Sequence, residues 1–594
     1  MVAKKQNWAV IGLAAVLIAC LVVGVFMLLR VRAREDEITK KIRAAMKVIE
    51  TTVQRENHDL AEQYVNNIDD LLTNNFAHWN SNADVLTKLT LFAINLMEFV
   101  IANGEEEIPS YIVVVRKIVE IIKNELKNKV FSKISIPWGD TWFPFSVHVT
   151  RLFILFQYFG NDTSLGYECH KQIIRIIPEI GISLRPVSKP HKELSLFYMT
   201  VPRLCSNYMF AFNDYNNDLK VKAFKELQQY LLFKPMTTYN VTEGFYTDDS
   251  CIYSENVGSY ELLRLFNNFH DRVYRAFGFS TGVKEYAMKL LPQILHPKIS
   301  IVPLGLFGRD GRIINYRTYP VTFQSTGIFI APFIGFGVFK TTDHLFYVRV
   351  QRPNIVAYQI KKSEGSKDLA LGWIQLRKIY RQRDPQLDPY KKEITWKTLQ
   401  DQPGLLTFKN NPQENVDPKT FKEDVAAELN HFWAEQVNSF IGQVNKDETD
   451  MDKKLLFWRN SYNFPKAYKN KHVAITEVGV VTSKGIQAHY TIDNQSGEDL
   501  RFNYKDEKNP WRVMKVNGSN TNPFHTVPNN TANNPSKFTW KMLTEEDEYN
   551  VRFDKNVMHF TFHNTEYSVT VGSINEYCTL NYNTGSETFY AKPQ

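Results

Sequence analysis

The chain has 594 residues, of which 43% are hydrophobic and 13% aromatic, so it can bury several cores and two or three domains are expected. Its formal net charge of +8 is mildly basic, which suits a polyanionic partner but is equally well explained by a solvated surface. Five scattered cysteines exclude a small protein stapled by disulfides.

The first predicted element is a membrane-spanning helix at Trp8–Leu29. This run carries no charged or strongly polar side chain and is long enough to cross a hydrocarbon core of about 30 Å. The alternative is a cleavable signal peptide, whose apolar region has only about 7–15 residues. Because Arg30, Arg32 and Arg34 stand where a small-residue cleavage site would lie, we predict a retained anchor within residues 1–33.

The orientation of this anchor rests on two opposing signals. The basic residues that follow the run outnumber Lys4 and Lys5, which precede it, and the positive-inside rule then favours a cytosolic or nucleoplasmic C-terminal region. Five Asn-x-Ser/Thr triplets, the acceptor sequence for N-glycosylation, favour the opposite orientation. Such triplets arise often by chance in an Asn-rich chain. They begin at Asn161, Asn240, Asn494, Asn517 and Asn529.

Residues 34–297 show the three- and four-residue apolar spacing of helices, separated by short Gly, Pro and Asn breaks. We therefore predict an all-helical domain there. The clearest predicted helices are Asp84–Ala102, Tyr111–Leu126, Val147–Phe159, Leu219–Leu232, Ser259–Phe277 and Val283–Leu290.

Residues 298–594 predict an antiparallel, sandwich-like β region, because short segments rich in β-branched and aromatic residues alternate with Gly, Asn, Asp or Pro. A polar helix is predicted within it at about Pro418–Val444, and a long surface loop at Asn517–Asn534. The predicted strands are 299–307, 312–316, 319–325, 327–333, 344–351, 354–362, 472–481, 486–493, 499–504, 511–516, 537–543, 549–553, 559–563 and 567–573.

The sequence predicts no cofactor and no metal site, since it has no CxxC, no HExxH and no compact His/Asp/Glu cluster. The glycines of Gly308–Tyr316 open a predicted strand and lack a phosphate-loop lysine, so we interpret them as a turn that carries Arg309 and Arg312. Beyond mild basicity nothing indicates a nucleic-acid partner.

Three segments are unusual. PWGDTWFPF crowds Trp138, Trp142 and two phenylalanines into a loop before a helix, where the rings either pack in the core or form a stacking platform for sugars. PRLCSNYMF places Asn207 in a predicted break between helices, where a capping role is the simplest interpretation. Gly244–Leu263 gathers two Asp residues and several hydroxyls in a loop before a helix, and since loops are generically polar, a structural role is the simpler interpretation.

Taken with the anchor, these segments and GRIINY followed by VTFQS occur in an order that resembles the large envelope protein of occlusion-derived baculovirus and nudivirus virions, whose ectodomain is a chondroitin lyase. That family is similar in fold to chondroitin AC and hyaluronate lyases. The resemblance spans most of the chain. It implies an α+β multidomain protein: an N-terminal transmembrane helix, an incomplete α/α toroid and then antiparallel β-sandwich domains.

The resemblance also implies a reaction, the β-elimination of uronic-acid-containing chains, and residues for it. Asn207 matches the amide that neutralises the uronate carboxylate, and Tyr260 matches the tyrosine that handles protons. An ordinary tyrosine pKa near 10 requires cationic help, which Arg309, Arg312 or Arg264 would supply. Arg309 and Arg312 are therefore predicted as catalytic and Arg264 as substrate-binding, while Trp138 and Trp142 fall at the family's sugar-stacking patch.

One departure from the family keeps two functions open. Ser254 stands where the family carries its histidine, and a hydroxyl cannot relay a proton near pH 7 as imidazole does. Either another histidine, such as His148, His191 or His270, takes that role, or the protein keeps the lyase fold without turnover and serves as a structural or attachment protein of the envelope. A cellular glycan-binding protein with no viral link is a third reading.

The partners that the resemblance implies are a chondroitin-type acidic polysaccharide, a membrane and other virion envelope proteins, without nucleic acid. The expected location is the virion envelope and, during assembly, the host inner nuclear membrane, since an apolar helix followed by basic residues resembles the family's sorting signal for that membrane.

Overall fold

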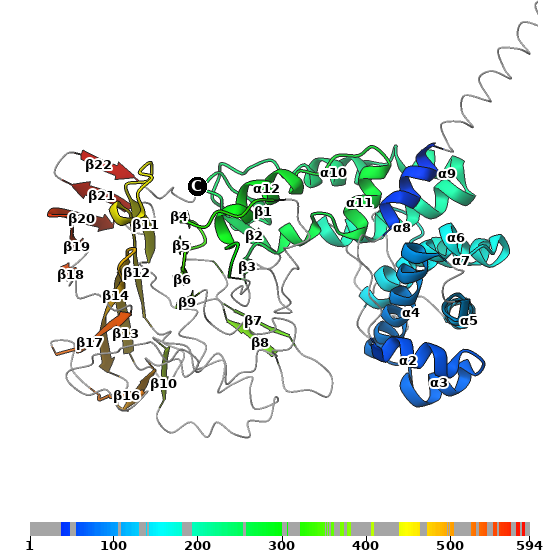
Figure 1. Cartoon of the computed structure of the whole chain (residues 1–594), viewed down its shortest axis with the longest axis horizontal. Helices are drawn as coiled ribbons and strands as arrows, with labels where there is room; N and C mark the ends of the chain where they lie inside the picture. Colours follow the sequence, from blue (N-terminus) through cyan, green and yellow to red (C-terminus); the bar gives the residue numbers. More distant parts are fainter. Residues whose placement is uncertain are drawn as a thin grey trace, which may run out of the picture. The chain divides into compact units, whose positions relative to one another are not determined.

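The computed structural model (Figure 1) groups the chain into two compact units. Unit 1 lies within Met1–Leu232 and Asn267–Thr281, and unit 2 within Phe233–Phe266 and Gly282–Gln594. This division is discontinuous in sequence and differs from the predicted domains 34–297 and 298–594, which stay predictions. The structure describes residues 37–47, 55–104, 109–129, 138, 142–180, 193–253, 257–299, 306, 321–350, 352, 355, 358–361, 369–372, 377–381, 405–408, 439–463, 472–495, 497, 499–503, 524–529, 534–542, 551–554, 557–571, 578–582 and 585–588.

Unit 1 is helical where it is described. Side-chain caps begin several of its helices: Asn82 accepts from two backbone N–H groups of α4, and Asp162 accepts from Leu165 of α7. Residues 37–46 are helical, and the further helices are α2 Arg55–Tyr64, α3 Ile68–Asn75, α4 Ala83–Asn103, α5 Pro109–Asn128, the π-helix η1 Pro144–Val149, α6 Thr150–Phe159, α7 Thr163–Ile176, α8 Glu193–Phe210, α9 Phe212–Asp218, α10 Lys222–Leu231 and α11 Phe269–Ala276.

The predicted anchor, Trp8–Leu29, lies outside the described residues and stays a prediction. Among the residues that the structure describes, α4 alone is long and apolar enough to cross a membrane, and more than half of its apolar window is buried inside the unit. A core helix of a globular unit has the same composition.

The helix predicted at Ser259–Phe277 is wrong as one element. A short 3₁₀ helix, η2 (Glu261–Leu265), is followed by a turn in which Asn267 adopts φ +59°, and α11 starts only after Asn268 caps it. The left-handed conformation at Asn267 stops helix propagation, and asparagine tolerates it better than most residues.

The region before residue 297 is also not purely helical. A three-stranded antiparallel sheet is formed by β1 (Gly244–Phe245), β2 (Cys251–Tyr253) and β3 (Val257–Gly258), followed by η2 and, after α11, by α12 (Val283–Ile294). Its strands are too short to show alternation in the sequence, and side-chain bonds from the loop between β1 and β2 hold them.

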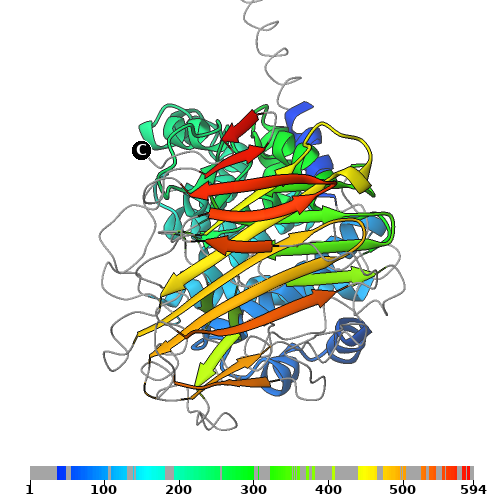
Figure 2. The same ribbon diagram turned by 90° about the vertical axis from the view of Figure 1, so that its left-hand side faces the viewer.

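The β region of unit 2 is a stack of antiparallel sheets, seen edge-on in Figure 1 and face-on in Figure 2. One sheet has the order β4-β5-β6-β9, with bounds Gly327–Ala331, Phe336–Lys340, His344–Arg349 and Arg377–Arg381. A second has the order β11-β12-β13-β14-β17, with bounds Phe440–Val444, Leu455–Asn463, His472–Val481, Ile486–Gln495 and Ser536–Met542. A third has the order β18-β19-β20-β21-β22, with bounds Val551–Asp554, Val557–Phe562, Thr565–Val571, Cys578–Tyr582 and Gly585–Thr588.

Strand β12, in the sheet β11-β12-β13-β14-β17, contributes side chains to two hydrophobic cores. Leu456 and Trp458 join the core shared with the β4-β5-β6 sheet, while Leu455 and Phe457 join the core shared with the β18–β22 sheet. Successive side chains on a strand point to opposite faces, so both faces of β12 are apolar and buried. The Trp458 ring lies over its cross-strand partner Gly479, where an added Cβ would overlap the ring.

Smaller sheets complete the described strands. They are β10-β15-β16, with bounds Leu405–Phe408, Leu500–Asn503 and Phe524–Val527, and β7-β8, with bounds Tyr358–Lys361 and Leu369–Gly372. The helix predicted at about Pro418–Val444 is wrong at its C-terminal end, because β11 occupies Phe440–Val444 and pairs with β12. The predicted strands at 299–307 and 312–316 lie mostly or wholly outside the described residues.

Candidate functional site

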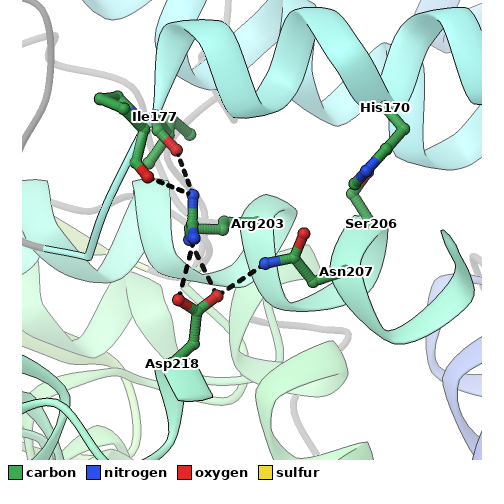
Figure 3. Close-up of polar contacts among 7 residues, drawn as sticks. His170, Ile177, Arg203, Ser206, Asn207 and Asp218 are labelled. Atoms are coloured by element: carbon green, nitrogen blue, oxygen red, sulfur yellow. Dashed lines mark hydrogen bonds and ion pairs between the residues drawn. The ribbon is translucent and has the colours of Figure 1, made fainter. Parts of the chain in front are cut away.

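Asn207 lies near the C-terminal end of α8 and is completely buried. Its Nδ2 donates to Asp218 Oδ2 at 2.8 Å, whereas its Oδ1 has no hydrogen-bond partner in the described part of the chain (Figure 3). The predicted helix break around it is wrong, since α8 runs unbroken from Glu193 to Phe210 and α9 follows Ala211. Its catalytic role stays a prediction, and in this conformation the amide serves the protein's own packing.

Asp218 also binds Arg203, one turn before Asn207 on α8. Arg203 Nε and Nη2 donate to the two carboxylate oxygens at 2.8 and 3.0 Å, and its Nη1 donates to the carbonyls of Ile177 and Pro178 at 2.6 and 2.8 Å. Figure 3 shows Arg203 between the Asp218 carboxylate and the carbonyls that follow the C-terminal end of α7. The network joins the ends of α7 and α9 to α8. It also pairs both carboxylate oxygens of Asp218, the charged partner of Asn207, with Arg203.

On the neighbouring face of α8, Ser206 forms a second polar contact. His170 Nδ1 lies 2.8 Å from Ser206 Oγ, and Gln157 Nε2 donates to the same oxygen at 3.1 Å. Burial lowers the pKa of His170 below its ordinary value. The pair resembles a serine–histidine dyad in its distance only, because both side chains are buried in the helix packing.

Trp138 is buried and not exposed at the surface. Its indole Nε1 donates to the carbonyl of Trp79 at 2.8 Å, its ring stacks on Phe145 with centroids 6.0 Å apart, and the Lys129 ammonium lies 5.0 Å from its centroid. Only 5% of the residue is exposed, so its ring is not open for a sugar in this conformation. Its substrate-binding role stays a prediction, and the described contacts are those of core packing.

Trp142 and Phe143 are more accessible. Trp142 is half-buried and meets the Phe143 ring edge-on, with centroids 5.5 Å apart, and Phe143 is 36% exposed. Phe143 also meets His148 at 5.2 Å and Tyr198 at 6.0 Å. We call Trp142, Phe143, His148 and Tyr198 the aromatic patch.

The aromatic patch owes its arrangement to an unusual backbone. His148 lies on the π-helix η1, a rare element that places consecutive side chains differently from an α-helix and is often found at functional sites. Sequence periodicity predicted an ordinary helix from Val147, so the π-helix was not foreseen. No sequence signal for it is visible beyond Pro144 at its start.

His270, on α11, contacts the aromatic patch through Tyr198. Its ring meets Tyr198 edge-on at 4.9 Å, it is 5% exposed, and its Nε2 has no hydrogen-bond partner among the described residues. Burial, with smaller contributions from Arg151 and His148, holds its pKa well below its ordinary value. A neutral, buried imidazole here serves packing rather than proton exchange with a substrate.

We predict that His270 makes unit 1 sensitive to acid. As pH falls below about 6.5, the unfolded chain takes up a proton that the folded chain cannot accept, so the stability decreases with falling pH. His270→Phe should reduce the drop in melting temperature between pH 7.5 and pH 5.5. Tyr274→Phe, one turn later and also buried, should leave that drop unchanged; equal drops in the wild type and His270→Phe would contradict the prediction.

Tyr260, in unit 2, is also fully buried. Its backbone N–H donates to the carbonyl of Leu306 at 2.8 Å, and its hydroxyl donates to the carbonyl of Asp249 at 2.9 Å. Phe329 and Phe336 pack against the ring. Burial raises the pKa of Tyr260 well above 10, the opposite of what a base at neutral pH requires. Its catalytic role stays a prediction.

The cation that interacts with Tyr260 is Arg349, which was not predicted from the sequence. Arg349, on β6, is buried, donates to the carbonyl of Gly258, and acts to lower the pKa of Tyr260 against the effect of burial. Arg264 forms an ion pair with Glu261 at 3.7 Å. Arg309, Arg312 and Ser254 lie outside the described residues. Arg349 stands 89 positions after Tyr260, so no local pattern could have signalled it.

Asp248 fixes the loop before Tyr260. Its carboxylate accepts from the N–H of Phe333 at 2.8 Å and from Ser250 Oγ at 2.9 Å, which ties the turn after β1 to the turn between β4 and β5. Burial raises its pKa above the ordinary value. The polarity of this loop is therefore structural where it is described. Within the described residues, no three His, Cys, Asp or Glu side chains gather as a metal site would require.

No protein-family model and no curated protein sequence matches this chain. Solved structures do match. The chondroitin AC lyase of Streptomyces coelicolor A3 in complex with chondroitin sulphate has a TM-score of 0.61 at 8% identity, covering 93% of this chain and 91% of its own. The chondroitin lyase ODV-E66, a baculovirus envelope protein, has a TM-score of 0.57 at 11% identity, covering 89% of this chain and 90% of its own.

These similarities extend over nearly the whole of both chains, so they concern the full succession of helical and sheet regions rather than one common motif. At identities of 8% and 11% they carry no residue-level correspondence. The chain has the toroid-and-sheet fold of the chondroitin lyases.

Proposed function

We propose that this protein binds acidic, uronate-containing polysaccharides of the chondroitin type through the aromatic patch of unit 1. The observation that carries the proposal is the exposed Phe143 ring, held edge-on by Trp142 and His148 within a lyase fold. Aromatic rings with one open face stack on the apolar faces of sugars, and a neighbouring imidazole can hydrogen-bond their hydroxyls.

Turnover by β-elimination is the second candidate, supported by the resemblance at Asn207 and Tyr260. Against it, both side chains are fully buried, Asn207 Nδ2 already donates to Asp218, and the Tyr260 hydroxyl already donates to a carbonyl. An amide that neutralises a uronate must present its N–H groups to the substrate. Since burial raises the pKa of Tyr260, any turnover through that side chain should increase towards alkaline pH.

We further propose the setting that the sequence indicates: an envelope protein of an occlusion-derived virion, anchored by Trp8–Leu29 and passing through the inner nuclear membrane during assembly. Attachment to glycans of the host gut lining would then be the role of the binding function. Other envelope proteins are the further partners of this proposal.

The test measures binding and product on the same sample. The full chain in detergent is mixed with chondroitin or hyaluronan, binding is followed by calorimetry, and unsaturated uronate is followed by its ultraviolet absorbance from acid to alkaline pH. We expect saturable binding with flat absorbance. Absence of binding would refute the proposal.

Rising absorbance would establish turnover instead. A matched pair of variants then tests whether Tyr260 is the residue that carries out the reaction. Tyr260→Phe and Tyr347→Phe each remove one buried hydroxyl that donates to a backbone carbonyl at 2.9 Å. Loss of about 10²–10⁴-fold in Tyr260→Phe alone would identify Tyr260 as the acid–base residue. Equal losses in both variants would indicate a structural effect.

A further inference from the structure

The helical residues 37–46 are docked firmly on unit 1. Ile42 and Met46 are completely buried, and the carbonyl of Ala45 accepts from Arg272 Nε at 2.8 Å. The Arg43 guanidinium lies over the Phe159 ring, 5.9 Å from its centroid. This segment therefore moves with α6 and α11 rather than as an independent tail.

The docked segment stands close in sequence to the predicted anchor. From Leu29, where the predicted span ends, to Glu37 there are eight Cα-to-Cα steps, which cannot extend beyond about 28 Å in any conformation. If Trp8–Leu29 spans a membrane, the side of unit 1 that carries residues 37–46 is held within that distance of the bilayer.

The exposed lysines of the docked segment suit a lipid headgroup layer. Lys40, Lys41 and Lys47 face solvent, and within the described part of this segment Glu37 is the acidic residue, paired with Lys41 at 2.7 Å. The anionic leaflet of a membrane attracts such basic clusters, each side chain near the surface contributing about 1 kcal/mol.

An exposed aromatic side chain, Phe212 of α9, is linked to residues 37–46 through α11. Arg272 of α11 holds Ala45, and Phe277, just after α11, stacks on Tyr215 with centroids 5.6 Å apart. Tyr215 stacks in turn on Phe212 of α9 at 5.7 Å, and Phe212 is 37% exposed. Figure 1 shows residues 37–46, α11, α8 and α9 gathered at one end of unit 1. Aromatic side chains are enriched at membrane interfaces.

We propose that Lys40, Lys41, Lys47 and Phe212 form a juxtamembrane face that binds the anionic phospholipid headgroups of the membrane in which the chain is anchored. The lysines would pair with lipid phosphates and carboxylates, while the Phe212 ring enters the headgroup layer. The proposal rests on the predicted span and is independent of the glycan-binding proposal. It would fix how unit 1 is presented on the membrane.

The experiment uses the full chain in nanodiscs whose lipids carry a headgroup spin label that quenches fluorescence. Cys20→Ser and Cys578→Ser provide the background, in which Cys169, Cys205 and Cys251 are buried thiols. A fluorophore is then attached at Asn213→Cys on α9 or at Asn74→Cys on α3. Both positions are exposed, and Figures 1 and 2 place α3 at the opposite end of unit 1 from residues 37–46.

We expect quenching at position 213 to exceed that at position 74 several-fold, and to be stronger with phosphatidylserine than with phosphatidylcholine alone. Replacing Lys40, Lys41 and Lys47 by Gln should lower the docking constant about a hundredfold, since each basic side chain near an anionic leaflet contributes about fivefold. The control triple replacement of Lys88, Lys123 and Lys127, on α4 and α5, removes two exposed and one half-buried lysine and should leave the docking constant unchanged. Equal quenching at both positions, equal effects of the two triples, or failure of the chain to enter nanodiscs would overturn the proposal.

Discussion

Replacing Arg203 by Met should lower the free energy of unfolding by about 3–5 kcal/mol, the usual effect of removing one partner from a buried ion pair. The substitution leaves the Asp218 carboxylate, 4% exposed, with Asn207 as its remaining described donor. It also releases the carbonyls of Ile177 and Pro178 at the end of α7. Urea denaturation measures the loss, and hydrogen exchange over α7–α9 shows whether it is local.

Two controls separate the buried charge from the lost packing. The double variant Arg203→Met with Asp218→Leu removes both charges and should recover part of the stability, because a buried pair replaced by apolar residues is often nearly neutral. Lys222→Met breaks a solvent-exposed pair with Glu226 and should leave the denaturation curve unchanged. A single variant as stable as the wild type would show that the Arg203–Asp218 pair contributes little.

Elements with a clear period were predictable from sequence, and their contacts show why. Strands β13 and β14 pair along ten residues each, so their alternation extends far enough to be recognised in the sequence, and α5 buries one continuous apolar stripe. Strand β12 was missed because both of its faces are buried, which erases the alternation that marks a half-exposed strand.

Asn207 was predicted to lie in a break between helices, whereas both it and Pro202 lie inside α8. Local propensity disfavours both residues within a helix. Contacts from outside the segment override that preference: Asp218 holds Asn207 and Arg203, and Arg203 reaches the end of α7. Propensity alone cannot predict such bonds, because the partners are brought together only by the packing of three helices.

The sequence suggested candidate site residues by their type, but it did not predict that most of them are buried. The sequence singled out Trp138, Trp142, Asn207 and Tyr260, and of these the structure leaves only Trp142 partly accessible. Burial depends on partners distant in the chain: the Tyr260 hydroxyl reaches Asp249, and Trp138 reaches the carbonyl of Trp79. The sequence alone does not show whether a polar or aromatic side chain in a loop faces solvent or the core.

Removing the open rings of the aromatic patch should weaken glycan binding about a hundredfold. In the double variant Trp142→Ala with Phe143→Ala, each aromatic lost from the centre of a binding surface costs about 1–2 kcal/mol, and 1.4 kcal/mol corresponds to a factor of ten in affinity. Because Phe143 is 36% exposed and Trp142 half-buried, the fold should survive. Calorimetry with chondroitin gives the affinity, and circular dichroism confirms that the helices remain.

The matched control is Tyr167→Ala on α7, which removes a ring that is 46% exposed but lies under Lys171 and outside the patch. The affinity of this variant should equal that of the wild type, because the Tyr167 ring is covered by the Lys171 ammonium and belongs to a separate ring cluster with His170 and Phe210. If Tyr167→Ala weakened binding as much as the patch variant, the glycan would be held by general surface contacts. The edge-on arrangement of Trp142, Phe143 and His148 would then be a consequence of packing on the π-helix and not a binding surface.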